Sequence, residues 1–224
     1  SDVYKRQRLV QTVVELCRQR LPNNMGIPAE QIQVLSPTRK GVCGTVNLNR
    51  ALQAALNPPA AGKRQKLWGD MVFREGDRVM QTRNNYDVVW EKDDGAMGAG
   101  IFNGDVGVIQ EIDPSGELIT IQFDDRTCVY TADLLNQLDM AYAMTVHKAQ
   151  GSEYRCVVLV SAAVAPALMV RGVLYTAITR ARELLVLVGD DVAPGQMAAN
   201  DRQQRRYSGL RRRLREEAAN HGVE

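Results

Sequence analysis

Two apolar runs enclose a polar loop in residues 140–160, which read MAYAMTVHKAQGSEYRCVVLV. The runs 140–144 and 156–160 are short, continuous and apolar, which is typical of strands buried in a parallel sheet. The loop between them gathers hydroxyl, imidazole, ammonium, amide and carboxylate side chains. Open α/β sheets bind ligands at loops that follow the carboxyl ends of their strands. This stretch therefore predicts an α/β sheet with a binding loop at its edge.

The two ends of the chain continue this pattern. Apolar residues recur at helical spacing in three further segments, and two more short apolar runs read as buried strands. The predicted helices are 3–20, closed by Pro22, then 42–56 and 166–181, and the predicted strands are 32–35 and 184–188. Strands that alternate with helices indicate a parallel sheet with helices on both faces.

The middle of the chain has a different pattern. Short β-type runs follow one another with turn signals between them, and Asp113-Pro114-Ser115-Gly116 is the strongest turn. The runs are 78–82, 106–112, 118–123 and 127–130. Several short strands in one stretch predict a small β-barrel. We expect an α/β domain made of residues 1–75 and 139–224, interrupted by a barrel at 76–138.

The charge follows a similar division. The 224 residues have a net charge of +2, but residues 93–139 hold ten acidic side chains and one basic, a net of −9, and the remainder carries +11. The arginine-rich segment 202–217 predicts a terminal helix that is either solvated or phosphate-binding. The basic part suits a polyanionic partner, although ordinary surface charge explains the division equally well.

The composition excludes several classes of protein. No apolar run reaches about 18 residues, so no membrane span is expected, and no secretory leader is visible. The four cysteines form no C-x-x-C, and two histidines are too few for a multi-histidine metal site. We therefore expect a cytoplasmic protein with no bound metal of its own.

Three other segments hold side chains that suit phosphate chemistry. Thr176 and Arg180 are four residues apart, which places them on one face of the predicted helix, where the guanidinium could bind phosphate. Arg39 and Lys40 stand between a predicted strand and a predicted helix, an arrangement that binds anions. Residues 76–86 end in amides and an aromatic ring that could contact nucleotides. Taken alone, each segment also fits a structural role as a salt bridge, a turn or a barrel strand.

In order and spacing, these segments resemble the second motor domain of superfamily 1 helicases, specifically its RecD-like (RecD/TraA) branch. Residues 34–41 (VLSPTRKG) resemble motif IV, 145–153 (TVHKAQGSE) motif V, and 175–182 (YTAITRAR) motif VI. Residues 76–138 resemble the SH3-like barrel that this family inserts between motifs IV and V. The likeness covers nearly the whole chain. It implies a RecA-like, P-loop-NTPase-type parallel sheet with helices on both faces, interrupted by the small SH3-like barrel.

The resemblance implies roles for residues near ATP. Arg180 would be the arginine finger that reaches the γ-phosphate, and Arg39 would be a second cation near that phosphate. Other residues would bind the nucleotide, with the carboxylate of Glu153 on the ribose hydroxyls. These nucleotide-binding residues are Gly151, Glu153, Lys40 and Thr176.

The resemblance also implies a path for single-stranded DNA. Motif V would face the strand with a hydroxyl, an imidazole and an ammonium group, and the barrel would lie along the path. The implied DNA-binding residues are Thr145, His147, Lys148, Asn84, Asn85 and Tyr86.

The chain departs from the family in one respect. A motor of this kind needs a phosphate loop, G-x-x-x-x-G-K-[ST]. The one Gly-Lys pair, Gly62-Lys63, is followed by Arg64, and Asn57 stands where the first glycine should be. We therefore expect a fragment, inactive alone, of a longer helicase whose missing N-terminal motor domain binds most of the ATP and Mg²⁺. No cofactor is expected to bind tightly to this chain.

Three hypotheses follow. The first is the C-terminal portion of an ATP-dependent DNA helicase (exodeoxyribonuclease V alpha/RecD-like) that moves 5′ to 3′ on single strands and unwinds duplex junctions. Its expected partners are DNA, the first motor domain, and nuclease or repair proteins, with no membrane. The second is a stand-alone, non-enzymatic nucleic-acid-binding module. The third is a protein-interaction module with the acidic barrel as adaptor.

Overall fold

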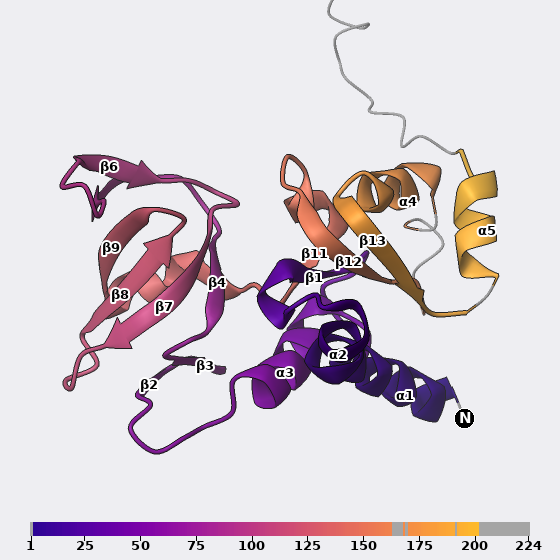
Figure 1. The fold of residues 1–224 in the computed structure, drawn as a ribbon, viewed down its shortest axis with the longest axis horizontal. Helices are drawn as coiled ribbons and strands as arrows, with labels where there is room; N and C mark the ends of the chain where they lie inside the picture. The colour runs from indigo at the N-terminus through magenta and orange to yellow at the C-terminus, as the bar shows by residue number, and fades with distance from the viewer. Residues whose placement is uncertain (1, 163–167, 169, 191, 202–224) are drawn as a thin grey trace, which may run out of the picture.

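The computed structural model describes residues 2–162, 168, 170–190 and 192–201. Its first body contains a four-stranded parallel sheet with the order β11-β1-β12-β13 (Figure 1). Both ends of the chain contribute, as expected. The strands are β1 (Ile32–Ser36), β11 (Ala143–Thr145), β12 (Tyr154–Val160) and β13 (Ala181–Val188). The three pairings between neighbours are all parallel.

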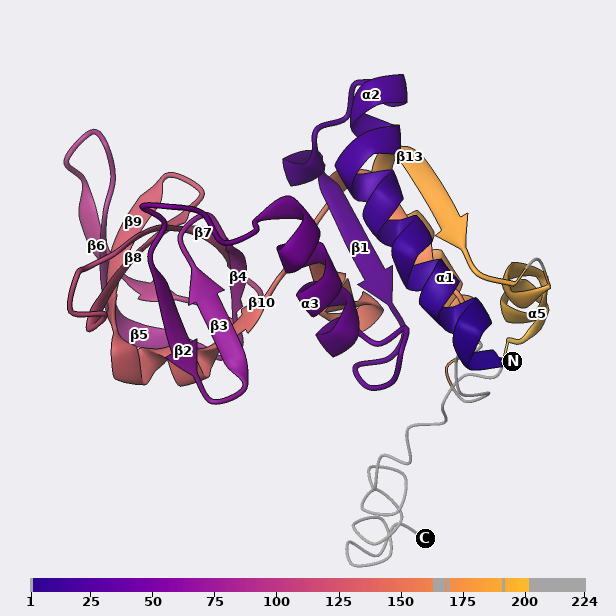
Figure 2. The same cartoon turned by 90° about the horizontal axis from the view of Figure 1, so that it is seen from below.

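Helices cover both faces of this sheet, which confirms the α/β prediction. On one face, Val34 and Val158 pack with α1 (Asp2–Glu15) and α3 (Thr45–Leu56), and Figure 2 shows these helices on either side of β1. On the other face, Leu35 and Leu159 pack with α4 (Arg171–Ile178). The short helix α5 (Ala193–Ala199) lies beside α4. Because alternate residues of each strand meet different helices, the strands are apolar throughout, which explains their continuous hydrophobic runs.

The predicted helix ends need correction. A π-helical turn η1 (Leu16–Arg20) and helix α2 (Leu21–Met25) continue α1, so Pro22 does not close the segment. Pro22 lies in the first turn of α2, directly after the π-helical turn, and the first turn is the part of a helix that tolerates proline. Gly26, with φ 63°, ends the helix. A 3-10 turn, η2 (Ala29–Gln31), then leads into β1.

Two other helices are shorter than predicted. Helix α3 begins at Thr45 instead of residue 42, because the preceding loop folds back on its amino end. Helix α4 spans Arg171–Ile178, and residues 166, 167 and 169 of the predicted segment lie outside the described residues. The arginine-rich segment 202–217 also lies outside them.

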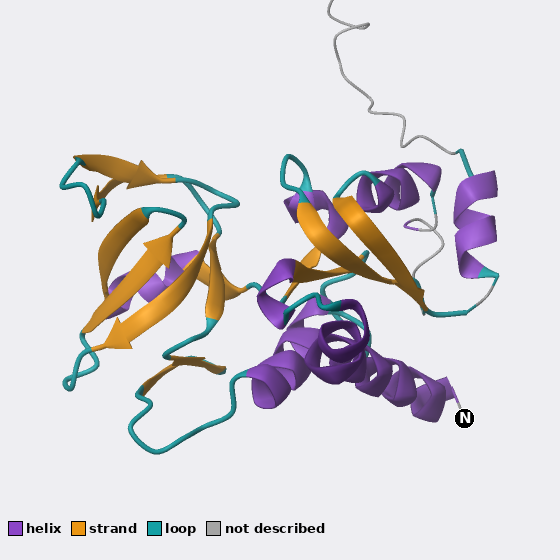
Figure 3. Cartoon of the chain, in the orientation of Figure 1, coloured by secondary structure: helices purple, strands orange, loops and turns teal. Residues whose placement is uncertain are grey.

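The second body is an antiparallel seven-stranded sheet with the order β10-β4-β7-β8-β9-β5-β6. Figure 3 shows strands dominating this side of the molecule and helices the other. Its strands are β4 (Arg78–Gln81), β5 (Asn85–Glu91), β6 (Met97–Ile101), β7 (Val106–Ile112), β8 (Leu118–Phe123), β9 (Arg126–Thr131) and β10 (Leu138–Met140). A 3-10 turn, η3 (Ala132–Gln137), joins the last two. Phe73, Phe123 and Tyr130 are buried at its centre.

Four of these strands match the predicted runs, and three were missed. β5 is largely exposed and does not alternate regularly between apolar and polar residues, and β6 is rich in glycine, so neither has a clear strand signal. A separate hairpin, β2 (Gln65–Trp68) and β3 (Met71–Arg74), was not predicted either.

The apolar run 140–144 is divided between the two sheets. Met140 pairs with Val79 in the barrel, whereas Ala143 pairs with Val34 in the parallel sheet. Ala141 and Tyr142 carry the chain across, so the prediction of one strand over 140–144 is wrong. The chain therefore returns from the barrel to the parallel sheet just before motif V.

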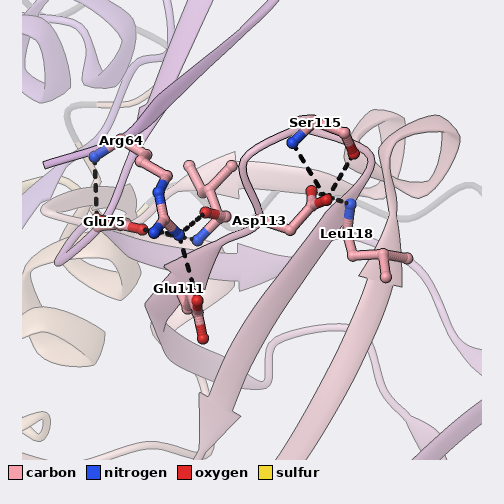
Figure 4. A network of polar contacts seen from close by, with 7 residues as sticks. Arg64, Glu75, Glu111, Asp113, Ser115 and Leu118 are labelled. Atoms are coloured by element: carbon pink, nitrogen blue, oxygen red, sulfur yellow. Dashed lines mark hydrogen bonds and ion pairs between the residues drawn. The ribbon is translucent and has the colours of Figure 1, made fainter.

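A guanidinium anchors the hairpin to the barrel (Figure 4). Arg64 Nη1 lies 3.2 Å from Glu111 Oε1 and 2.5 Å from the Ile112 carbonyl oxygen. Glu75 accepts hydrogen bonds from the amides of Arg64 and Ile112, both at 2.9 Å. Burial opposes ionisation of Glu75, yet these hydrogen bonds lower its pKa overall. In the predicted turn, the Ser115 hydroxyl and the Leu118 amide donate to Asp113 and lower its pKa to about 2.

Candidate functional site

The loop after β11 is fixed by apolar residues and displays polar ones. Val146 and Ala149 are buried in the 3-10 turn η4 (Val146–Ala149), whereas His147 is exposed and Lys148 is half-buried. Gly151 follows with φ 88°, a conformation that side-chain-bearing residues rarely adopt. Motif V therefore packs its apolar side chains inward and presents its charged and hydrogen-bonding groups outward.

The loop after β1 is held just as firmly. Thr45 and Val46 at the start of α3 donate backbone hydrogen bonds to the carbonyls of Thr38 and Arg39, at 3.1 and 3.2 Å. Gly44 lies so close to this loop that a Cβ there would overlap its backbone oxygens. The side chains of Arg39 and Lys40 remain exposed.

One carboxylate joins these two loops. Asp139 Oδ2 lies 3.3 Å from Arg39 Nη1 and 3.5 Å from Lys148 Nζ. Asp139 belongs to barrel strand β10, whereas its two partners follow strands of the parallel sheet. The structure thus brings Arg39, predicted near ATP, and Lys148, predicted near DNA, onto the same anion.

Arg180 lies elsewhere in the site, beyond the end of α4. The helix ends at Ile178, so Thr176 and Arg180 do not share a helix face as predicted. Arg180 Nη1 donates to the Ser152 carbonyl at 2.9 Å, and Nη2 donates to Thr179 Oγ1 at 3.3 Å. Its buried Nε has no hydrogen-bond partner among the described residues. No carboxylate of the described chain lies within ion-pair distance of this guanidinium.

The remaining residues predicted near the nucleotide make local contacts. Glu153 Oε2 lies 3.3 Å from Arg182 Nε, and both side chains are more than half exposed. Such a surface pair contributes about 0–1 kcal/mol, so it opens at little cost. The Thr176 hydroxyl donates to the Gly172 carbonyl within its own helix, at 2.8 Å.

The barrel presents its predicted residues at the start of β5. Asn84 accepts a hydrogen bond from the Asn103 amide at 3.0 Å, and Asn85 Nδ2 donates to Gln137 Oε1 at 3.0 Å. Tyr86 is 67% exposed and meets the ring of Phe102 edge to face, with centroids 5.7 Å apart. The asparagines therefore shape the loop, and the two rings form an exposed aromatic pair.

The structure groups the predicted residues into two sets. One set contains Arg180, Gly151 and Glu153, linked through the Ser152 carbonyl. The other contains Arg39, Thr145 and Lys148, which line one pocket of about 320 Å³ together with Asp139.

Sequence reasoning missed Asp139, Ser152 and Phe102. Ser152 acts through its backbone, and Asp139 reads as one more acid of the barrel, so neither carries a signal in a single sequence. Phe102 reads as a scattered aromatic residue, because its pairing with Tyr86 arises only when β5 and β6 pair.

Two family models match the chain. The ATP-dependent RecD-like DNA helicase SH3 domain matches residues 48–123, and the UvrD-like helicase C-terminal domain matches residues 140–188. The second match contains the motif V and motif VI segments, and the first contains most of the barrel.

Curated relatives agree with these models. The ATP-dependent RecD2 DNA helicase of Deinococcus radiodurans is 36% identical over 82% of this chain and 23% of that protein. The RecBCD enzyme subunit RecD of Mycolicibacterium smegmatis is 31% identical over 83% of this chain and 30% of that protein. A crystal structure of Pif1 helicase from Bacteroides in complex with ADP-AlF3 and ssDNA is 16% identical over 96% of this chain and 50% of that chain, with a TM-score of 0.48. The chain thus spans less than a third of the length of these two curated relatives.

No helix in the described ranges is both long enough and apolar enough to cross a membrane.

Proposed function

This chain is a C-terminal region of the RecD-like superfamily 1 DNA helicases, with the SH3 domain and the UvrD-like C-terminal domain of that family, and we propose that it supplies the arginine finger and part of the single-strand path of an ATP-dependent helicase. The names of its relatives support the ATP-dependent activity. The proposal extends to 5′-to-3′ movement on single-stranded DNA and unwinding at duplex junctions.

The observation that carries the proposal is the environment of Arg180. Its guanidinium is tied to motif V by the Ser152 carbonyl, yet its charge meets no carboxylate of the described residues, and its Nε is buried without a partner. Arg180 is half-buried, and a partly desolvated cation without a counter-ion favours an anion beside it. Phosphoryl transfer requires such cations where negative charge develops, and an arginine finger contributes about 10³–10⁵ in rate. The γ-phosphate of ATP is the anion proposed here.

ATP and Mg²⁺ would be held mainly by a first motor domain, because residues 1–224 contain no phosphate loop. Within this chain, Gly151 leaves room for the nucleotide, and Glu153 is free to bond the ribose hydroxyls once its weak pair with Arg182 opens. Lys40 of motif IV and Thr176 of motif VI would also bind the nucleotide. ATP would then close the two motor domains on one another.

The strand would follow the opposite end of motif V. Thr145, His147 and Lys148 lie on the same loop as Gly151, so a shift of the loop on the nucleotide side moves the strand-facing groups as well. On the barrel, Tyr86 and Phe102 offer exposed rings, and stacking on a base contributes about 1–3 kcal/mol. The state of the bound nucleotide and the affinity for the single strand would therefore be coupled through one loop.

Strand separation by the intact protein tests the proposal. With ATP, it should unwind a duplex that carries a 5′ single-stranded tail and leave a duplex with a 3′ tail intact. Unwinding from the 3′ tail would contradict the proposed direction. No unwinding of either substrate would contradict helicase activity, and tight strand binding without ATP hydrolysis would favour a non-enzymatic nucleic-acid-binding module.

A further inference from the structure

The ion bridge at Asp139 crosses between the two bodies of the molecule. Arg39 and Lys148 follow neighbouring strands β1 and β11, so their positive charges lie close to each other. The carboxylate that lies between them comes from the barrel. Two cations fixed on one anion form a ready site for a phosphate oxygen, which bonds guanidinium and ammonium groups more strongly than water does.

The bridge is weak enough to be exchanged. Arg39 is 59% exposed, Lys148 33% and Asp139 24%, so water screens both ion pairs. The distances of 3.3 and 3.5 Å are also longer than those of strong charge-assisted hydrogen bonds, at about 2.7–2.9 Å. A phosphate with more charge and more acceptor oxygens than a carboxylate can therefore take its place.

The surrounding pocket suits a nucleotide in size and chemistry. It has a volume of about 320 Å³ and includes four methionines, Met71, Met80, Met140 and Met144. Methionine side chains adapt to varied apolar partners such as a base. Arg50 adds a third cation that makes no hydrogen bond or ion pair with any described residue, and Asp70 is the one other acid of the lining.

We propose that a backbone phosphate of single-stranded nucleic acid binds Arg39 and Lys148 by displacing Asp139, which is thus an internal competitor that limits strand affinity. This inference rests on the strand binding proposed above. It assigns Arg39 to the strand instead of to ATP, because Arg39 shares its anion with Lys148, which the proposed function places on the strand.

The competitor role predicts tighter binding when the carboxylate is removed. In fluorescence anisotropy with a labelled oligothymidylate of roughly 20 nucleotides, Asp139→Asn should bind about 3–10-fold tighter than wild type at low salt, since it frees two cations. Asp125→Asn is the matched control, because it removes the same charge from a barrel residue paired with Lys92 at 2.8 Å, outside the pocket. The control should change affinity less than about twofold.

Two further variants make the result specific to this site. Lys148→Gln and Arg39→Gln should each weaken strand binding, and adding either to Asp139→Asn should remove most of its gain. Asp139→Ser removes the carboxylate with a smaller side chain, and it replaces Asp139→Asn if thermal melting shows that the latter is unfolded.

The outcomes separate this inference from the proposed function. If wild type binds the oligonucleotide and Asp139→Asn gains no more than Asp125→Asn, the competitor role is wrong and strand binding stands. If ATP displaces the oligonucleotide from the Asp139→Asn chain, the site belongs to a nucleotide and its assignment to the strand is wrong. If no variant binds at low salt, both the competitor role and strand binding by this chain fail.

Discussion

Replacing Asp77 with alanine should destabilise the junction between the α/β body and the barrel. Asp77 is fully buried at the start of the barrel. Its Oδ1 accepts hydrogen bonds from Asn57 Nδ2 and the Tyr142 hydroxyl, at 2.7 and 2.8 Å. Its Oδ2 accepts from Gln53 Nε2 and the Arg74 amide, at 2.6 and 2.7 Å. One carboxylate therefore holds helix α3, the β3 end of the hairpin and the crossing point at Tyr142.

The size of the loss follows from the donors that Asp77→Ala leaves behind. The Gln53 and Asn57 amides keep one acceptor each, the carbonyls of Val72 and Glu75. The Tyr142 hydroxyl and the Arg74 amide lose the one acceptor that the described residues provide. An orphaned buried donor costs about 1–3 kcal/mol. Relief from burying a carboxylate, whose pKa that burial raises, offsets part of this cost. We expect a net loss of about 2–4 kcal/mol from a total of about 5–15 kcal/mol.

Urea unfolding followed by circular dichroism measures this loss. A double-mutant cycle with Tyr142→Phe identifies its cause: in the Asp77→Ala background, removing the hydroxyl should cost at least about 0.5 kcal/mol less than in wild type. Asp113→Ala is the control, because this carboxylate also accepts amide and hydroxyl hydrogen bonds but lies in an exposed turn where water replaces it. Equal losses in the two alanine variants, or additive effects in the cycle, would refute the junction described here.

Three other predictions concern stability and reactivity. Burial raises the pKa of Asp77 above its ordinary value of 3.8, so the stability that Asp77 contributes is complete below about pH 3.8 and is lost as pH rises through the folded-state pKa. The difference in unfolding free energy between wild type and Asp77→Asn should therefore decline as pH rises over that window. A difference that stays constant with pH would contradict this. Gly44→Ala should cost about 1–3 kcal/mol in urea unfolding, because its Cβ overlaps the Arg39 and Lys40 carbonyls, whereas Gly172→Ala, which meets no atom within 4 Å, should cost nothing. Burial raises the pKa of all four cysteine thiols, to about 12 for Cys17 and about 11 for Cys128. A thiol reagent should therefore label no cysteine in the folded chain and all four after unfolding. Rapid labelling of the folded chain would contradict this.

Much of the fold could be predicted because its elements have a local hydrophobic signal. β7 and β8 match their predicted bounds, since they alternate buried and exposed residues between clear turns. β5 and β6 could not be predicted, because Met97 and Val89 are exposed and the glycines of β6 carry no pattern. The division of the run 140–144 was also out of reach, since both sheets bury the same kinds of side chain.

The sequence predicted which loops belong to the candidate site, but not which of their side chains lie together. The side chains of Arg39, Lys148 and Arg180 stand out because charged residues follow strands or a helix in a mainly apolar context. Which of them share a partner depends on tertiary contacts between segments 100 residues apart, as for Arg39 and Asp139. The separation of Arg180 from Arg39 is likewise a result of the fold alone.

The most direct test of the central claim is the rate of ATP hydrolysis by the intact protein, stimulated by single-stranded DNA, in Arg180→Ala and Arg182→Ala. The two arginines are neighbours in motif VI, but Arg180 lacks a carboxylate partner among the described residues, whereas Arg182 pairs with Glu153 at the surface. We predict that Arg180→Ala loses about 10³-fold or more in rate, that Arg182→Ala stays within a fewfold of wild type, and that both still bind the strand. Normal turnover in Arg180→Ala, or equal losses in both variants, would contradict the account.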